Sequence, residues 1–273
     1  MSAPVRLAAF AAVLAVIFGA AALAGGAVGQ IHDPAATAKD EMSMEADPIR
    51  GLAVSENGLT LDLVRRAAHA GTASRLAFRI LGGDGRAVRD YDLEHTKRMH
   101  LIVVRRDLTG FQHLHPRLLP DGTWTAPLTL PEAGTYRVFA DFSVGGKPTT
   151  LADDLQVDGD VRSRRLPPPS KSARTDGFRV RLTDGPLRAD EESALTFEVT
   201  RDSRPVSLQD YLGAKGHLVA LRQGDLAFLH VHPDENSLRF DATFPNAGSY
   251  RLFLQFKVAG RVHTAAFTLG VSR

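Results

Sequence analysis

The sequence predicts an all-β protein made of two tandem β-sandwiches, immunoglobulin-like or cupredoxin-like, after an N-terminal hydrophobic helix. From Gly51 onward, short runs of alternating apolar and polar residues are broken by Gly, Pro and Asp, a pattern typical of strands and turns. No window of this region has a helical period of useful length. The same succession of motifs occurs twice, which indicates a tandem duplication of about 110 residues.

One repeated motif is Ala-Gly-x-Tyr-Arg, which occupies residues 133–137 and returns at residues 247–251. This segment resembles the strand that carries the tyrosine corner of immunoglobulin-like folds. Val138 and Leu252 stand two residues after the tyrosines, where antibody domains have a disulfide cysteine. The sequence therefore predicts sandwiches that are held together by packing alone.

Five segments of the first unit are expected to form its main strands. Turns are expected at Gly82–Gly85 and at Asp121-Gly122, because Gly and Asp tolerate turn conformations. Residues 99–104 are apolar apart from His100, which predicts a buried strand. The expected strands cover residues 59–64, 75–81, 99–104, 123–130 and 136–142.

Residues 1–29 are predicted to be a signal peptide or a membrane anchor. An essentially uncharged run rich in Ala, Val, Leu and Ile follows Arg6, and Ala22-Leu23-Ala24 resembles a cleavage site. The length of the run also suits an uncleaved membrane span. Both alternatives place the rest of the protein outside the cytoplasm, either anchored to the cell membrane or secreted.

Composition divides the remainder of the chain into four segments. Residues 30–50 lack apolar periodicity and contain several acids, which favours a flexible spacer. The first sandwich is expected over residues 51–158 and the second over residues 174–273. Between them, residues 159–173 hold three arginines and three consecutive prolines, a composition that favours a stiff, extended linker.

The overall composition excludes several classes of function. The 33 basic and 31 acidic side chains nearly balance, and no basic run with interleaved aromatic residues indicates nucleic-acid binding. The chain has no cysteine, which excludes disulfides, thiolate nucleophiles and cysteine-based zinc sites. It also lacks the thiolate that a blue-copper electron-transfer centre requires.

A histidine motif occurs in both units, at residues 111–116 and 228–233. Each copy contains His-x-His-Pro, and a further histidine lies thirteen positions before the first of the pair. Side chains at i and i+2 of a strand share one face, so each copy presents two neighbouring imidazoles, and imidazole is the commonest ligand of Zn, Cu and Ni. The candidate metal ligands are His95, Met99, His100, His113 and His115 in the first unit and His217, His230 and His232 in the second.

These histidines also have a structural interpretation. A half-buried imidazole can donate a hydrogen bond to a backbone carbonyl and fasten its strand as a latch. A duplication copies structural histidines and metal ligands alike, so the repetition of the motif does not distinguish the two roles. The first unit is the better metal candidate, because His95 and Met99 have no counterparts of the same type in the second unit.

The sequence lacks the motifs of the relevant enzymes, so we expect a protein without enzymatic activity. The His-Glu-x-x-His of zinc proteases and the Gly-x-Ser-x-Gly of serine hydrolases are both absent. A cupin oxygenase also places His-x-His on a strand, but with a glutamate three or four residues later. Here His115 is followed by Pro-Arg-Leu-Leu-Pro-Asp, which contains no glutamate.

Three segments of the first unit carry a resemblance to a known group of domains. They are residues 95–104 (His-x-Lys-x-Met-His-Leu-Ile-Val-Val), 111–116 (Phe-x-His-Leu-His-Pro) and 130–142, which ends in Tyr-x-Val-Phe-Ala-Asp-Phe. Together they resemble bacterial exported domains similar to YtkA-like and other small immunoglobulin-like domains found with heavy-metal and copper-handling proteins. The resemblance covers roughly residues 75–157 and is weaker in the second unit. It implies a non-enzymatic exported protein with candidate ligands at His95, His100, His113 and His115.

We therefore expect an exported, membrane-tethered protein that binds or buffers a transition metal, copper before zinc, through clustered histidines. The alternative is a structural or protein-interaction module whose histidines are hydrogen-bonded latches. The expected partners are a metal ion, the membrane through the N-terminal segment and an exported protein, but no nucleic acid. Because imidazole ligands must be neutral, binding is expected to weaken below about pH 6.5.

Overall fold

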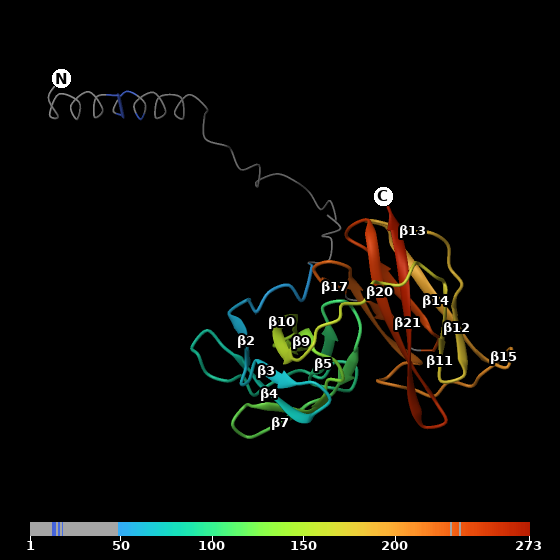
Figure 1. Ribbon diagram of the computed structural model, residues 1–273, viewed down its shortest axis with the longest axis horizontal. Helices are drawn as coiled ribbons and strands as arrows, with labels where there is room; N and C mark the ends of the chain where they lie inside the picture. Colours follow the sequence, from blue (N-terminus) through green and yellow to red (C-terminus); the bar gives the residue numbers. More distant parts are fainter. Residues whose placement is uncertain (1–12, 15, 17, 19–48, 230, 235) are drawn as a thin grey trace. The chain divides into compact units, whose positions relative to one another are not determined.

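The computed structural model describes residues 13, 14, 16, 18, 49–229, 231–234 and 236–273 (Figure 1). Ala46–Arg273 forms one compact unit. Within the described part of the chain, no helix is long and apolar enough to cross a membrane. The predicted export segment and the predicted spacer lie almost entirely outside the described residues, so both stay predictions.

The first sandwich consists of two five-stranded sheets, with the strand orders β1-β2-β4-β8-β7 and β3-β10-β9-β5-β6. Its neighbouring strands are antiparallel, apart from the parallel pair β3 and β10. The first sheet contains β1 (Ser55–Glu56), β2 (Leu59–Leu63), β4 (Ala73–Leu81), β8 (Trp124–Thr129) and β7 (Arg117–Leu118). The second sheet contains β3 (Ala67–His69), β10 (Lys147–Asp158), β9 (Gly134–Val144), β5 (His100–Arg105) and β6 (Gln112–Leu114).

The second sandwich repeats this arrangement, coloured yellow to red in Figure 1. One sheet has the order β11-β12-β14-β19-β18 with β15 paired to β14, and the other has the order β13-β21-β20-β16-β17. The first sheet contains β11 (Ser172–Thr175), β12 (Phe178–Leu182), β14 (Glu192–Arg201), β15 (Arg204–Pro205), β19 (Arg239–Thr243) and β18 (His232–Pro233). The second sheet contains β13 (Leu187–Arg188), β21 (Arg261–Ser272), β20 (Gly248–Val258), β16 (Gly216–Arg222) and β17 (Phe228–Leu229).

The predicted all-β fold with tandem sandwiches is confirmed. The five expected strands of the first unit appear as β2, β4, β5, β8 and β9. Strand β12 shows why such segments form strands, since its alternate residues are buried and exposed in a strict period of two. The repeated tyrosines form corners, because Tyr136 donates a hydrogen bond to the Glu132 carbonyl at 3.0 Å and Tyr250 donates one to the Asn246 carbonyl at 2.8 Å.

Each sandwich has its own apolar core, and a third apolar cluster joins the two sandwiches. Strand β5 is buried along both of its faces, because Leu101 and Val103 enter the core of the first sandwich whereas Ile102 and Val104 face outward. The second sandwich supplies equivalent outward residues from β16 and β20. The cluster comprises Ile102, Val104, Leu108, Phe139 and Ala152 from the first sandwich and Val219, Leu221, Leu226, Phe228 and Phe253 from the second.

The linker between the sandwiches lies along this junction. Leu166 packs against the apolar cluster between the two sandwiches. The Arg164 backbone N–H donates a hydrogen bond to Asp107 at 2.9 Å, and the Ser170 N–H donates one to the Thr268 carbonyl at 2.9 Å. The linker is thus attached to both sandwiches by backbone hydrogen bonds.

Removal of one aromatic ring from the junction should destabilise the whole unit. Phe111 and Phe253 stack with ring centroids 4.0 Å apart, and Phe253 is 4% exposed. We expect Phe253→Ala to lower the free energy of unfolding by about 3 kcal/mol, because the cavity loses both burial and stacking. Urea denaturation measures this change, with Val262→Ala at a side chain 41% exposed as the control. Equal midpoints for the two variants would contradict the packing described above.

Candidate metal centre

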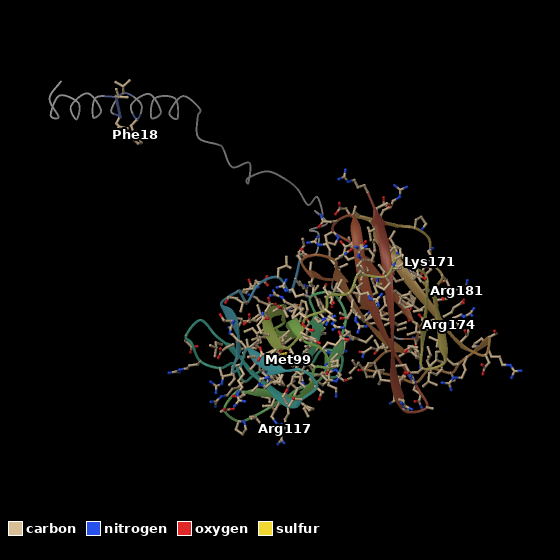
Figure 2. All side chains as sticks on the ribbon, in the orientation of Figure 1. Phe18, Met99, Arg117, Lys171, Arg174 and Arg181 are labelled. Carbon is tan, nitrogen blue, oxygen red and sulfur yellow. The ribbon has the colours of Figure 1, made fainter. Side chains whose placement is uncertain are left out.

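The histidine cluster begins on β5, where the alternation of the strand separates two neighbouring candidate ligands. His100 lies on the same face as Ile102 and Val104, toward the second sandwich, and is 2% exposed. Met99, labelled in Figure 2, belongs instead to the core of the first sandwich and is 1% exposed. The structure therefore does not bring the predicted Met99 thioether to the histidines, because adjacent strand residues face opposite sides.

Three histidines of the first sandwich form a group suited to one metal ion. One ring nitrogen each from His100, His113 and His115 lies within 4.8 Å of the others. His100 Nδ1 and His113 Nε2 are 3.0 Å apart. Nitrogens bound to one ion at 2.0–2.1 Å lie roughly 3–4 Å apart, so the first pair already fits and His115 needs a shift of about 1 Å.

With the Gln255 amide oriented as described, hydrogen bonds at the outer nitrogens indicate which ring nitrogens carry hydrogen. His100 Nε2 lies 3.1 Å from the Glu94 carbonyl oxygen, and His113 Nδ1 lies 2.6 Å from Gln255 Oε1. Both oxygens only accept, so each of these nitrogens donates. A neutral imidazole has a single N–H, so His100 Nδ1 and His113 Nε2 direct lone pairs at each other. A cation between the two nitrogens would relieve that repulsion.

A reversed Gln255 amide gives a different arrangement. Its NH₂ group would then donate to His113 Nδ1, which moves the ring hydrogen to Nε2, and His113 Nε2 would donate to His100 Nδ1. That chain of hydrogen bonds is complete without a metal and is the latch of the alternative hypothesis. In the orientation observed, Gln255 Nε2 donates to Thr264 Oγ1 at 3.3 Å, which leaves Oε1 to accept from His113.

His115 favours the metal site over the metal-free latch. Its Nε2 is buried and has no hydrogen-bond partner among the residues that the structure describes. The centroid of its ring lies 4.8 Å from that of His113 and 5.2 Å from that of His100. A buried donor or acceptor without a partner costs about 1–3 kcal/mol, and the latch leaves His115 Nε2 without one in either orientation of the Gln255 amide. A metal ion bound by all three imidazoles would satisfy it.

Two further histidines border this group. His217 on β16 of the second sandwich lies with its ring centroid 4.7 Å from that of His113 and 5.4 Å from that of His100. Its ring is stacked on that of His100, with an interplanar angle of 7°, and His217 is not part of the group whose nitrogens converge. His95 lies 6.1 Å from His100 and 6.0 Å from His217 between ring centroids.

The structure does not describe the side chains of the other two candidate ligands of the second unit, His230 and His232. His230 lies outside the described residues. The backbone of His232 belongs to β18 and pairs with Asp241 on β19, but its side chain is not described. Both therefore stay predictions.

The turn that supplies the Glu94 carbonyl has an unusual backbone. His95 and Thr96 have φ angles of 46° and 68°, in the left-handed region. The corresponding turn of the second sandwich places Leu212 and Gly213 there, so only the first unit has a β-branched residue at the second position. Such a conformation costs roughly 1–3 kcal/mol for a β-branched residue and is kept only where the surrounding structure holds it.

Both sandwiches match one protein family. A sequence profile described as a domain of unknown function, DUF8832, matches residues 53–159 and again residues 173–273. The chain belongs to the DUF8832 family. The two matches agree with the tandem duplication predicted from the repeated motifs. No curated protein matches the chain by sequence.

Solved structures that are similar to this chain include an adhesin, a set of fibronectin(III)-like modules and an alpha-2-macroglobulin. The Escherichia coli adhesin FdeC is 15% identical over 81% of this chain and 66% of its own, with a TM-score of 0.29. The fibronectin(III)-like modules of Clostridium thermocellum CbhA are 9% identical over 78% of this chain and 93% of theirs, with a TM-score of 0.23. An Escherichia coli alpha-2-macroglobulin is 14% identical over 78% of this chain and 20% of its own, with a TM-score of 0.27. The likeness concerns the sandwich fold alone, and the chain spans just under two thirds of FdeC.

Burial keeps the histidines of the DUF8832 protein neutral. Loss of solvent lowers the pKa of His100 to about 4, with a smaller effect from the nearby His115, His95 and Lys97. The same cause lowers the pKa of His113 to about 3 and that of His115 to about 4. The pKa of His217 also lies well below its usual value for this reason. Imidazoles in this state have lone pairs available for metal binding at neutral pH.

Sequence reasoning did not find Gln255, although a signal for it exists. Gln255 stands in the repeated strand motif Phe-Leu-Gln-Phe, where the first unit has Phe-Ala-Asp-Phe with Asp141. A polar residue between core positions of both copies indicates a partner on the outer face of the sheet.

Asp141, the counterpart of Gln255 in the first sandwich, lies opposite His100 on the neighbouring strand. Burial raises the pKa of the Asp141 carboxyl to about 6.

The pKa shifts predict that acid destabilises the metal-free protein. Between pH 6.5 and about pH 4 the unfolded chain binds protons at these histidines whereas the folded protein does not, so stability falls as the pH decreases. From pH 7 to pH 5.5 we expect a loss of about 1 kcal/mol from the buried His100 and further losses from His113 and His115. Asp141 offsets part of this loss, because its raised pKa lets the folded protein bind a proton before the unfolded chain does. Urea denaturation in a chelator at the two pH values measures this loss.

The matched variants for this experiment are His113→Ala/His115→Ala and His69→Ala. The double variant should show a weaker dependence on pH. His69 lies on β3 with its side chain 78% exposed, so its variant should keep the slope of the parent. A parent protein that is equally stable at both pH values would contradict the neutral, desolvated cluster.

Proposed function

We propose that this protein is an exported, membrane-tethered metal-binding protein that takes up a divalent transition metal, Cu²⁺ in preference to Zn²⁺, through His100, His113 and His115. Two observations carry the proposal: one ring nitrogen from each of the three histidines lies within 4.8 Å of the others, and His115 Nε2 is buried without a hydrogen-bond partner among the described residues. The other ring nitrogens of His100 and His113 donate to the Glu94 carbonyl and to Gln255. Such outer hydrogen bonds are typical of metal-binding histidines.

The kind of metal follows from the ligand atoms. Imidazole nitrogen suits Cu and Zn, and affinity for such sites rises along the first-row series to a maximum at Cu²⁺. Sulfur ligands would favour Cu⁺, but Met99 lies in the sandwich core and the chain has no cysteine. The lowered pKa values of the ligands also mean that protons compete with the ion only near pH 4 rather than near pH 6.5.

Export and tethering are proposed from the N-terminal segment. Residues 7–29 form an uncharged, apolar run that suits a secretory signal or an anchor. The role of a metal-binding sandwich in that location is capture or buffering of the ion rather than catalysis. No motif of a metalloprotease, serine hydrolase or cupin oxygenase accompanies the histidines.

The second candidate function is a structural or protein-interaction module with latch histidines. It is favoured by the hydrogen-bond chain that a reversed Gln255 amide would complete through His113 and His100 to the Glu94 carbonyl. In that case the imidazoles join the two sandwiches directly. An ion would then have no effect on the stability of the protein.

Metal titration tests the proposal. We expect the chain to bind one Cu²⁺ and, more weakly, one Zn²⁺ in calorimetry, with a higher melting temperature in the presence of the ion. An ion at a hundred times its Kd adds about 2.7 kcal/mol to the stability of a folded protein that alone binds it. His113→Ala/His115→Ala should lose at least 100-fold in affinity, because only one of the three ligands remains.

His69→Ala is the control for this titration, since this exposed histidine is not part of the cluster. It should bind the ion like the parent. Equal stoichiometry and affinity in the double variant and the parent would refute the assignment. A double variant that melts lower in metal-free buffer, with no ion-dependent shift in the parent, would establish the latch instead.

A further inference from the structure

The second sandwich holds the His113 ring in place. Gln255 lies on β20, where Leu254 and Phe256 enter the core of the second sandwich. Alternation therefore directs Gln255 outward, toward the first sandwich, and its side chain is 6% exposed. Its Oε1 accepts from His113 Nδ1 at 2.6 Å, and its amide nitrogen donates to Thr264 on the adjacent β21.

We infer that Gln255 is the positioning residue of the metal centre and that this centre is shared between the two sandwiches. The inference rests on the proposed function. The first sandwich supplies the three ligands. The second supplies Gln255 Oε1, which accepts the hydrogen of His113 Nδ1. The lone pair of His113 Nε2 is then available to bind the ion. In this orientation the Gln255 amide nitrogen donates to Thr264 Oγ1, and the apolar cluster at Phe111 and Phe253 holds the two sandwiches together beside His113.

The repeat indicates that this role arose in one copy only. The position of Gln255 in the second sandwich corresponds to Asp141 in the first. Asp141 accepts a hydrogen bond from Thr150 Oγ1 at 2.7 Å, a residue of its own sandwich. Gln255 instead reaches across the junction to His113, so the two copies have different tasks at the same strand position.

This arrangement couples ion binding to the contact between the sandwiches. Ligands in one sandwich depend on an acceptor in the other, so any change that weakens the junction also weakens the bond from Gln255 to His113. By thermodynamic linkage, the bound ion stabilises the junction to the same extent. The protein thereby needs both of its repeats for one metal site.

Three variants of the full chain test the role of Gln255. Gln255→Leu removes the acceptor, and we expect a 10- to 100-fold loss of Cu²⁺ and Zn²⁺ affinity. Gln255→Glu keeps an acceptor and removes the donor that the latch requires, so its affinity should equal or exceed that of the parent. Gln156→Leu is the matched control, because Gln156 is an exposed glutamine on β10 that accepts a hydrogen bond from Thr135.

Nitrogen-15 NMR of the imidazoles in metal-free protein supplies a readout that does not depend on the ion. The parent and Gln255→Glu should show His113 with hydrogen on Nδ1, and Gln255→Leu should lose this preference. A parent with hydrogen on Nε2, or a Gln255→Leu variant with parental metal affinity, would overturn the inference. A parent that binds neither Cu²⁺ nor Zn²⁺ would refute the proposed function itself, whichever ring hydrogen is found.

Discussion

The apolar contact between the two sandwiches is the interaction on which the rest of this structure depends. Residues of β5 and β16 that point away from their own cores bury one another at the junction, together with the stacked rings of Phe111 and Phe253. Full burial of each such side chain contributes roughly 1.5–3 kcal/mol. Because His100 and His217 continue the same strand faces, this contact also brings the histidines of both repeats together.

The cluster combines features that are costly unless an ion is bound. Its imidazoles are desolvated and neutral, two of their ring nitrogens face each other at 3.0 Å, and a third ring nitrogen is buried without a partner in the described region. A left-handed turn at His95 and Thr96 supports it with the Glu94 carbonyl. Packing at the junction offsets these costs, and metal binding gives all three nitrogens a common partner.

Much of the fold follows from the sequence because each strand shows its own periodicity. The repeat predicts two sandwiches, and the tyrosines of residues 136 and 250 predict the corners that both units form. The His-x-His spacing likewise predicts that His113 and His115 share a face. Met99 was predicted as a ligand because it is next to His100 in the sequence. Neighbouring residues of a strand face opposite sides, so His100 faces the junction whereas Met99 lies in the core of the first sandwich.

What the sequence leaves open is the contact between the repeats. Val104 and Val103 look alike as strand residues, and only the assembled chain assigns one to the junction and the other to the sandwich core. Gln255 was missed for the same reason. Its partner His113 belongs to the other sandwich and lies 142 positions away in the chain, so no local sequence pattern indicates the contact. His217, which sequence reasoning ranked below the first-unit histidines, is brought beside them by this contact.

The most direct measurement is a crystal structure of the copper- or zinc-loaded chain with anomalous scattering from the ion. We expect one ion bonded at 2.0–2.1 Å to His100 Nδ1, His113 Nε2 and a ring nitrogen of His115, with the hydrogen bond from His113 Nδ1 to Gln255 retained. An ion bound elsewhere, or no ion at the three histidines at saturating metal, would contradict it.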